Sequence, residues 1–182
     1  MSQHDRDRIV VAVDKVLLKA RLRKGALEIQ RAPAIINSHI VLGSAQHARD
    51  TDLLNSLGIT QIANCASAAE TQTNAAFYAT ISYTELGAAD EEDYDVLQHL
   101  NAVHALLADR ARRPGQRVLV HCVAGRNRAA ALVIGHLVRT GVPLLEAVAA
   151  VAAKRPLILG NPGFKRQLAA LELARQQQQQ QQ

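Results

Sequence analysis

Residues 117–130, Arg-Val-Leu-Val-His-Cys-Val-Ala-Gly-Arg-Asn-Arg-Ala-Ala, constrain the fold more than any other stretch of the chain. The apolar run 118–120 is typical of a buried strand, and the alanine- and leucine-rich run after Gly125 is typical of a helix. A loop that leads from a strand into a helix gathers backbone N–H groups beside the positive end of the helix dipole. The stretch therefore predicts an anion site.

Two side chains in this stretch suit phosphate chemistry, Cys122 and, six residues later, Arg128. A helix N-terminus and nearby cations lower the pKa of a cysteine thiol from about 8.5 to about 3.5–7.5, and the thiolate is a strong nucleophile. An arginine offers a planar fork that holds two phosphate oxygens into the transition state. We expect the anion to be bound by the backbone of Val123, Ala124, Gly125, Arg126, Asn127 and Arg128.

Other residues of the chain are expected to support this loop. Gly125 allows the tight backbone path that the loop needs. His121 is expected to orient the loop and to favour the thiolate. Asn127 either supports the loop by hydrogen bonds or caps the following helix. Asn161, in Asn-Pro-Gly-Phe, is interpreted as a turn residue first and as a brace for the loop second.

The pattern His-Cys-x5-Arg after a valine-rich strand resembles the signature of the cysteine-dependent protein tyrosine phosphatases, and more narrowly of their dual-specificity branch. Two further blocks, HIVLGSAQHARD…LLNSLGITQIANCAS and KRPLILGNPGFKRQLAALE, resemble the opening and closing segments of dual-specificity phosphatases, so the resemblance spans about residues 35–172. It implies an α/β fold with a mainly parallel central sheet flanked by helices. It also implies hydrolysis of phosphotyrosine, with or without phosphoserine and phosphothreonine, through a phosphocysteine.

The resemblance implies an aspartate as proton donor, and the run 90–95 offers several carboxylates. In the dual-specificity branch a strand tyrosine is followed by six residues and then the acid, which lies 32 residues before the nucleophile. Asp90 fits both spacings, because it is Tyr83 plus seven and because 122 minus 90 is 32. It would protonate the leaving group and later deprotonate the attacking water. Glu91 and Asp93 stay as alternatives, and such a run also suits a helix N-terminus.

Ala129 departs from the resemblance, because the family has a serine or threonine after the arginine. That hydroxyl makes the cysteine a better leaving group, and its loss is expected to slow hydrolysis of the phosphoenzyme by roughly 10–100-fold. The loop HCVAGRNRAA also resembles that of the phosphatases of regenerating liver, which have alanine here. Two alternatives stay open: a low-turnover phospho-binding module, motivated by Ala129, and a phosphatase of a phosphoinositide or an RNA 5′ end, motivated by Arg126.

Composition limits the remaining function classes. Residues 1–34 carry eight Lys/Arg against four Asp/Glu, within a total net charge of +5, but no aromatic residues that could stack on bases. We therefore expect a phosphoprotein substrate and a phosphate or sulfate ion in the loop, and no nucleic acid. The histidines have no metal-ligand spacing, so no metal or cofactor is expected. Two cysteines without a signal peptide or transmembrane segment indicate the cytoplasm, with the nucleus left open.

The chain divides into three parts by sequence pattern. Residues 1–34 predict a basic amphipathic arm with a helix over 5–24, which we expect to pack on the domain, with substrate contact or docking of a partner left open. Residues 35–175 alternate strands with helices at 46–57, 98–112, 127–140, 143–153 and 163–175, which predicts the catalytic domain. Residues 176–182 form a glutamine tail that extends the last helix, frays or aggregates. Cys65 is interpreted as a core thiol, and a disulfide with Cys122, as in related enzymes, is the alternative.

Overall fold

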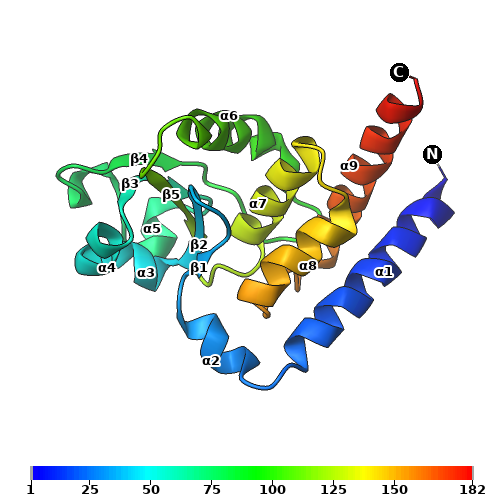
Figure 1. Ribbon diagram of the computed structural model, residues 1–182, viewed down its shortest axis with the longest axis horizontal. Coiled ribbons are helices and arrows are strands. Elements are labelled where there is room, and N and C mark those ends of the chain that lie inside the picture. The colour runs from blue at the N-terminus through cyan, green and yellow to red at the C-terminus, as the bar shows by residue number, and fades with distance from the viewer. Residues whose placement is uncertain (1, 182) are drawn as a thin grey trace.

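The computed structural model describes residues 2–181, and its centre is a five-stranded sheet with helices on both faces (Figure 1). The strand order is β1-β2-β5-β3-β4. β1 (Ala34–Ile35) runs antiparallel to β2 (Ile40–Ser44), whereas β2, β5 (Arg117–Cys122), β3 (Ile59–Asn64) and β4 (Ser82–Glu85) run parallel to one another. The predicted α/β class with a mainly parallel sheet is confirmed.

β5 lies in the middle of the sheet because it is apolar on both faces. Val118, Leu119 and Val120 are at most 1% exposed, as is typical of a strand covered by helices on each side. The carboxyl end of β5 pairs with Ser44 of β2 and with Asn64 of β3. Ligands of open α/β sheets bind beyond these carboxyl ends, so the sheet places the predicted anion loop at such an edge.

The two faces of the sheet are covered by different helices (Figure 1). One face packs on α3 (Ala45–Arg49) and α4 (Thr51–Ser56) through a small apolar cluster that includes Leu54 and Leu119. Tyr78, directly after the 3₁₀ turn η1 (Ala75–Phe77), belongs to the same cluster. The main core lies on the other face, which is covered by α6 (Leu100–Ala111), α7 (Arg128–Arg139), α8 (Leu144–Lys154) and α9 (Pro162–Gln180). Because most of α7 is buried among these helices, the end of the anion loop is rigidly held.

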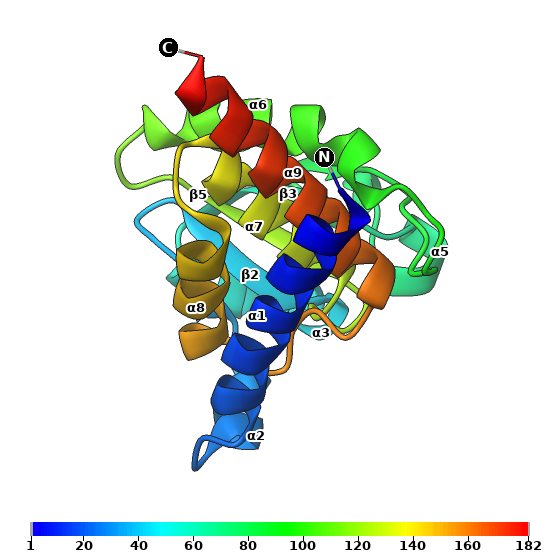
Figure 2. The same ribbon diagram turned by 90° about the vertical axis from the view of Figure 1, so that its right-hand side faces the viewer.

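The N-terminal arm consists of α1 (Gln3–Arg21) and α2 (Ala26–Arg31). Val13 and Leu17, each 1% exposed, face the main core, and α1 lies along α8 and α9 (Figure 2). The turn between α1 and α2 is the lowest corner of the molecule in both ribbon views. None of the helices within residues 2–181 is long and apolar enough to cross a bilayer.

Three boundaries differ from the sequence prediction. The helix expected over 46–57 is interrupted at Asp50, which leaves the helical conformation and caps α4 by accepting a hydrogen bond from Leu53 N at 2.9 Å. The stretch 65–74, expected to be irregular, contains the short helix α5 (Ala68–Thr71), and the 3₁₀ turn η2 (Val96–His99) precedes α6. The last helix continues past residue 175 as far as Gln180, which is one of the outcomes expected for the glutamine tail.

Candidate active site

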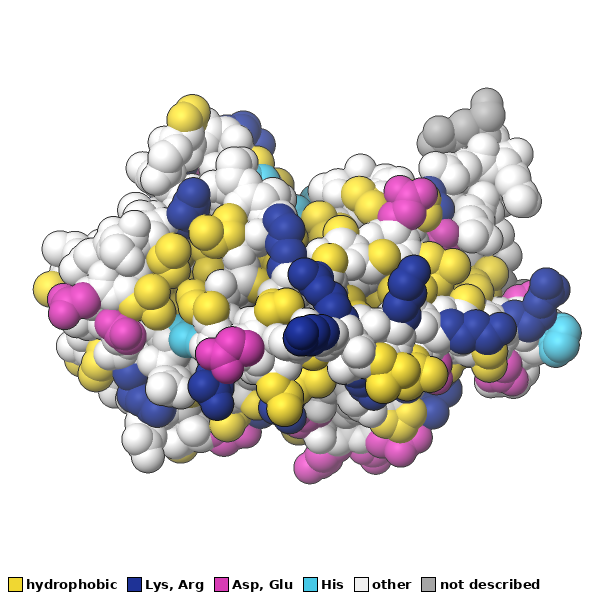
Figure 3. Space-filling view, turned by 60° about the horizontal axis from the view of Figure 1, so that its bottom comes forward, with side chains coloured by type: hydrophobic (Ala, Val, Ile, Leu, Met, Phe, Trp, Pro, Cys, Tyr) yellow, Lys and Arg dark blue, Asp and Glu magenta, His cyan; other side chains and the backbone are white. Residues whose placement is uncertain are grey.

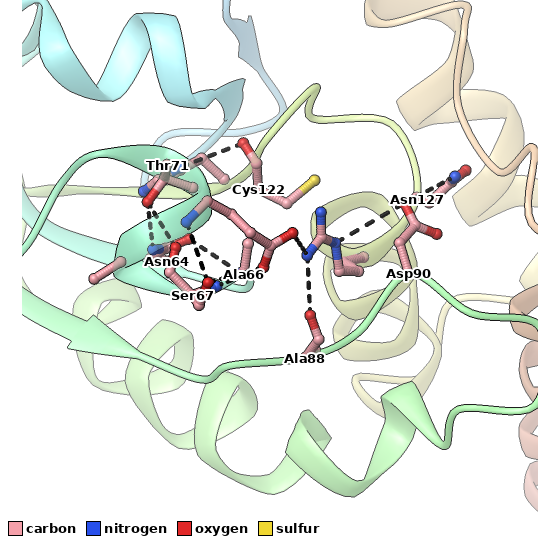
Figure 4. A network of polar contacts seen from close by, with 12 residues as sticks. Asn64, Ala66, Ser67, Thr71, Ala88, Asp90, Cys122 and Asn127 are labelled. Carbon is pink, nitrogen blue, oxygen red and sulfur yellow. Dashed lines mark hydrogen bonds and ion pairs between the residues drawn. The ribbon is translucent and has the colours of Figure 1, made fainter.

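The anion loop joins the end of β5 to the start of α7, in the strand–loop–helix order that the sequence predicts. Cys122 is the last residue of β5 and is 2% exposed, and Arg128 is the first residue of α7 and is 4% exposed. In Figure 4 the sulfur of Cys122 points toward the side on which Asp90 and Asn127 lie. The structure therefore gathers the predicted nucleophile and the predicted acid around one loop.

Every carbonyl group from Val123 to Asn127 accepts a hydrogen bond from outside the loop. In chain order the donors are Ala45 N, Arg155 Nη2, Arg155 Nε, Leu159 N and Ala131 N, at 3.1, 3.0, 2.7, 2.9 and 2.8 Å. None of the backbone N–H groups of the same five residues donates a hydrogen bond within residues 2–181. A loop with its carbonyls occupied and its N–H groups free is suited to bind an anion.

Gly125 has a structural reason to be glycine. Its φ of 62° lies in the left-handed region, and a Cβ atom there would come within 2.0 Å of the carbonyl oxygen of Gly43. Any larger residue would therefore push the loop away from β2.

Arg155 holds the loop in place through the carbonyl groups of Ala124 and Gly125, a role that sequence reasoning missed. Its Nη2 and Nε donate to the two loop carbonyls described above. Its Nη1 donates to the carbonyl oxygens of Gln30 and Ala32, at 3.1 and 2.9 Å. Burial lowers the pKa of Arg155 to about 10, so the 2%-exposed guanidinium remains charged at neutral pH. The same side chain therefore joins α2 to the anion loop.

Arg128 is held by one edge of its guanidinium. Its Nη1 donates to Glu70 Oε1 at 2.9 Å and to the carbonyl oxygen of Ala88 at 3.0 Å. Its Nε is buried without a hydrogen-bond partner within residues 2–181 and lies 3.9 Å from Asp90 Oδ2. The contacts around the site extend from Ser67 and Ala88 to Asp90 and Asn127 (Figure 4). Because Nη1 is occupied, the Nε edge stays available to a ligand in the loop.

Glu70 is a second residue that sequence reasoning missed. Its Oε2 accepts hydrogen bonds from the backbone N and the hydroxyl of Ser67, both at 3.0 Å, which leaves Oε1 for Arg128. Burial acts to raise the pKa of Glu70, but the hydrogen bonds from Ser67 and Arg128 outweigh it and lower that pKa. The motif Ser67-x-x-Glu70 is a capping box, a signal that predicts the turn but not its partner Arg128.

Two asparagines hold Asp90 over the loop. Asn127 Nδ2 donates to Asp90 Oδ2 and Asn161 Nδ2 donates to Asp90 Oδ1, each at 3.1 Å. Asn127 does not cap α7 with its side chain; its Oδ1 accepts from Gly160 N at 2.8 Å and Asn161 N at 3.2 Å. Asn161 caps α9 and contacts Asp90 at once, so it is both a turn residue and a brace.

The loop that carries Asp90 rests on the N-terminus of α9. A Cβ atom at Gly163 would lie 1.8 Å from the carbonyl oxygen of Glu92, so only glycine permits this close approach. Gln167 fixes the same loop by donating to Tyr94 O at 2.7 Å and by accepting from Val96 N at 3.0 Å. The closing segment of the chain therefore sets the position of Asp90.

His121 is fully buried beside the nucleophile, with its Nδ1 3.4 Å from the carbonyl oxygen of Cys122. Burial lowers the pKa of His121 to about 4, so the ring is neutral at physiological pH. Its expected help to the thiolate is therefore not that of a positive charge. Cys65 is a free, buried thiol whose pKa is raised well above its usual range, first by burial and then by the proximity of Cys122.

A hollow of about 520 Å³ opens beside the anion loop. Its lining includes Val123 and Ala124 of the loop and four arginines, Arg31, Arg49, Arg126 and Arg155, with Glu70 as the one acidic residue. Cys122, Arg128 and Asp90 do not line it. Within residues 2–181, the Arg126 side chain has no hydrogen-bond or ion-pair partner, and no His, Cys, Asp and Glu side chains are grouped to hold a metal.

This fold and loop define an α/β phosphatase of the cysteine-dependent class, and comparisons with known proteins name the family. Residues 40–174 match the model of the dual specificity phosphatase catalytic domain. The chain is 32% identical to dual specificity protein phosphatase 1 of Arabidopsis thaliana over 79% of this chain and 71% of that protein. It is 36% identical to mouse dual specificity protein phosphatase 13B over 74% of this chain and 69% of that protein.

Solved structures agree with the sequence comparisons. Human DUSP28 has a TM-score of 0.70 at 28% identity, over 81% of this chain and 99% of that chain. A mouse putative dual specificity phosphatase complexed with zinc tungstate has a TM-score of 0.70 at 29% identity, over 81% and 90%. The chain belongs to the dual specificity phosphatase family, and it is a phosphoric monoester hydrolase of the dual-specificity protein tyrosine phosphatase type.

Proposed function

We propose that this protein hydrolyses phosphotyrosine, and phosphoserine or phosphothreonine, in protein substrates through a phosphocysteine formed on Cys122. The observation that carries this proposal is the anion loop, in which every carbonyl from Val123 to Asn127 accepts a hydrogen bond. The five backbone N–H groups of the same residues and Arg128 Nε make no hydrogen bond within residues 2–181. These donors suit the three non-bridging oxygens of a phosphoryl group.

In the proposed first step, the Cys122 thiolate attacks phosphorus and the bond between phosphorus and the substrate oxygen breaks. Asp90 gives its proton to the departing oxygen, so an alcohol or phenol leaves rather than an alkoxide. Arg128 and the loop N–H groups stabilise the charge on the transferring group.

In the second step, water attacks the phosphocysteine. Asp90 takes a proton from this water, the bond between phosphorus and sulfur breaks, and Cys122 leaves as the thiolate. Asn127 and Asn161 keep the Asp90 carboxyl group near the phosphorus in both steps by their contacts at 3.1 Å.

The proposed roles are tested by hydrolysis of an aryl phosphate series and of matched phosphotyrosine, phosphoserine and phosphothreonine peptides. We expect Cys122→Ser to abolish turnover. Asp90→Asn should slow hydrolysis about 10²–10⁴-fold for poor leaving groups and much less for good ones. An Asp90→Asn variant with unchanged activity on a poor leaving group would remove Asp90 from the role of acid, and Glu91 or Asp93 would be tested next.

A second candidate function is removal of phosphate from a multiply charged, non-protein substrate such as a phosphoinositide or an RNA 5′ end. The arginine-lined hollow and Arg126, which has no side-chain partner among the described residues, favour it because they add positive potential beside the loop. Parallel kcat/KM values for phosphopeptides, phosphoinositides and 5′-triphosphorylated RNA decide between the two candidates. Arg126→Ala should lower kcat/KM for the multiply charged substrates more than for a phosphotyrosine peptide if the second candidate holds.

A further inference from the structure

The corner between α1 and α2 combines exposed leucines with unpaired cations. Leu22 and Leu27 are 76% and 71% exposed, more than any other large apolar side chain described in residues 2–181, and Leu18 is 56% exposed. This corner lies outside residues 40–174, the range that matches the family model. The phosphatase fold itself therefore does not explain why these leucines face solvent.

The charge of the same segment is almost entirely positive. Residues 15–31 contain six Lys/Arg and a single acidic residue, Glu28, which pairs with Arg31. Lys15, Lys19 and Lys24 have no hydrogen-bond or ion-pair partner within the described part of the chain. Figure 3 shows Lys and Arg side chains in a band across this face, with hydrophobic side chains between them. Three ammonium groups are thus free to meet an anionic partner.

The apolar part continues from this corner along the arm. A groove of about 810 Å³ lies between α1 and α8, with a floor and walls of small or apolar residues and with Lys15, Lys19 and Arg23 along its edge. Arg21 and Arg23 fix the end of α1 to the domain through hydrogen bonds to the carbonyl oxygens of Ile158 and Ala153, at 2.9 and 3.1 Å. The leucines are therefore presented by a rigid support rather than by a free arm.

We propose that this corner docks on an anionic membrane surface, with Leu22 and Leu27 inserted among the lipids and Lys15, Lys19 and Lys24 on the headgroups. Apolar side chains that project from a convex corner, surrounded by cations, are typical of segments that lie in a membrane interface. The corner is the lowest point of the molecule in both ribbon views, so a flat surface reaches it without a clash. A partner helix or a second copy in the groove would leave the protruding tip and its cations unused.

Docking in this way turns the catalytic loop toward the lipids. Leu27 and Arg31 line the same hollow as Val123, Ala124 and Arg126 of the loop. Arg21 and Arg126 also line a second hollow together. A phosphatase docked at this corner therefore acts on substrates presented at the membrane surface, an extension that rests on the proposed function; the docking itself does not.

The test is cosedimentation of the full chain with phosphatidylcholine vesicles that contain phosphatidylserine, compared with phosphatidylcholine alone. We expect binding to the mixed vesicles only, weakened by added salt because the attraction is partly electrostatic. Leu22→Glu/Leu27→Glu should weaken binding about 100-fold, since each leucine contributes about tenfold. The matched control is Leu145→Glu at the start of α8, which is 40% exposed and borders a hollow with Ile9 near the other end of α1, and it should bind as the parent chain does.

A second pair of variants isolates the charge. Lys19→Glu/Lys24→Glu should weaken binding at least about tenfold, whereas Arg112→Glu/Arg113→Glu at the end of α6 should not. Equal binding by the corner variants and their controls, or no binding by the parent chain, overturns the proposal. A dimer in sedimentation velocity that Leu22→Glu dissolves, without vesicle binding, also overturns it in favour of a second copy.

Aryl phosphate hydrolysis in solution separates this proposal from the proposed function. The single variant Leu22→Glu and the charge variant Lys19→Glu/Lys24→Glu should retain the parent rate, because none of these three residues lines either hollow beside the anion loop. Loss of vesicle binding with an unchanged rate is the expected result. A parent chain that binds vesicles but hydrolyses no aryl phosphate would overturn the proposed function and leave the docking surface standing.

Discussion

Ala129 departs from the family signature, which has a serine or threonine after the arginine. It is fully buried in the first turn of α7, directly after Arg128, and it has no hydroxyl to donate to the sulfur of Cys122. In the proposed mechanism, its effect belongs to the second chemical step, in which the sulfur leaves phosphorus. Attack by the thiolate does not need that hydrogen bond, so the two steps should respond differently to the residue.

We expect Ala129→Ser to speed hydrolysis of the phosphocysteine by roughly 10–100-fold, from the value of one hydrogen bond to a charged group. Rapid-mixing kinetics with an aryl phosphate should give a burst followed by slow turnover for the parent chain and a smaller or absent burst for the variant. Ala130→Ser, one position further into the helix, is the matched control and should leave the slow phase unchanged. A parent chain without a burst would show that the hydroxyl is dispensable here.

We propose that Glu70 is a positioning residue that acts on the proposed reaction through its contact with Arg128. Because it occupies Nη1 at 2.9 Å, it sets the direction of the Nε edge. Glu70→Gln should lower kcat by about tenfold or more, as expected for loss of a charge-assisted hydrogen bond, with a smaller change in KM. Glu28→Gln, whose carboxylate is exposed and pairs only with Arg31, is the matched control. Equal rates for the two variants would contradict a positioning role for Glu70.

At the scale of the elements, local patterns were predictable and distant partners were not. The strand, loop and helix over 117–130 follow from apolar periodicity and one glycine within a short segment. The contacts that complete the site join Arg128 to Glu70 across 58 positions and Arg155 to Gly125 across 30. A single sequence holds no periodicity or motif that links such distant positions. Cys122, Arg128 and Asp90 could therefore be proposed as catalytic residues from the sequence, whereas Glu70 and Arg155 could not be assigned a role.

A different limit, which is local, applies to the helix expected over 46–57. Its apolar spacing continues through Asp50, but the side chain of Asp50 forms a better bond as the cap of α4 than as a mid-helix residue. The hydrogen bond from Leu53 N to the Asp50 side chain therefore ends one helix and begins the next, in place of a single continuous helix.

The arm contributes to stability through its inner face. Leu17→Ala, at a position 1% exposed, should lower the free energy of unfolding by about 2–5 kcal/mol, because it leaves a cavity between α1 and the domain. Leu18→Ala, its neighbour at 56% exposure, is the control and should change that free energy by less than about 0.5 kcal/mol. Chemical denaturation of both variants measures the difference, and equal midpoints would show that the arm is not part of the cooperative unit.

For the whole molecule, acid should lower stability through two buried histidines. Burial lowers the pKa of His121 and of His136 to about 4, below the value of about 6.5 expected in the unfolded chain. The unfolded state therefore takes up protons first, so their contribution is complete above about pH 6.5 and is lost as the pH falls toward 4. Near pH 5 the loss is about 2 kcal/mol for each histidine.

Urea denaturation at a series of pH values checks this expectation. His136→Gln should reduce the dependence of the unfolding free energy on pH between about pH 6.5 and 5. Glu70 and Glu172 add to the loss at lower pH, because hydrogen bonds from Arg128 and Arg175, among others, outweigh burial and lower the pKa of each carboxyl. An unfolding midpoint that does not move over this range would contradict neutral, buried histidines.

The guanidinium of Arg155 links the anion loop to the end of α2, a segment that lies outside the signature motif. The Arg155 side chain donates hydrogen bonds to the carbonyls of Ala124 and Gly125 in the loop and to those of Gln30 and Ala32 at the end of α2. A change in the conformation of either segment is therefore expected to affect the other. A chain trimmed to begin at residue 40 would keep the whole matched family range yet leave two charged N–H donors without acceptors. A domain boundary placed at the start of the family match would therefore remove residues whose carbonyl groups hold Arg155 against the loop.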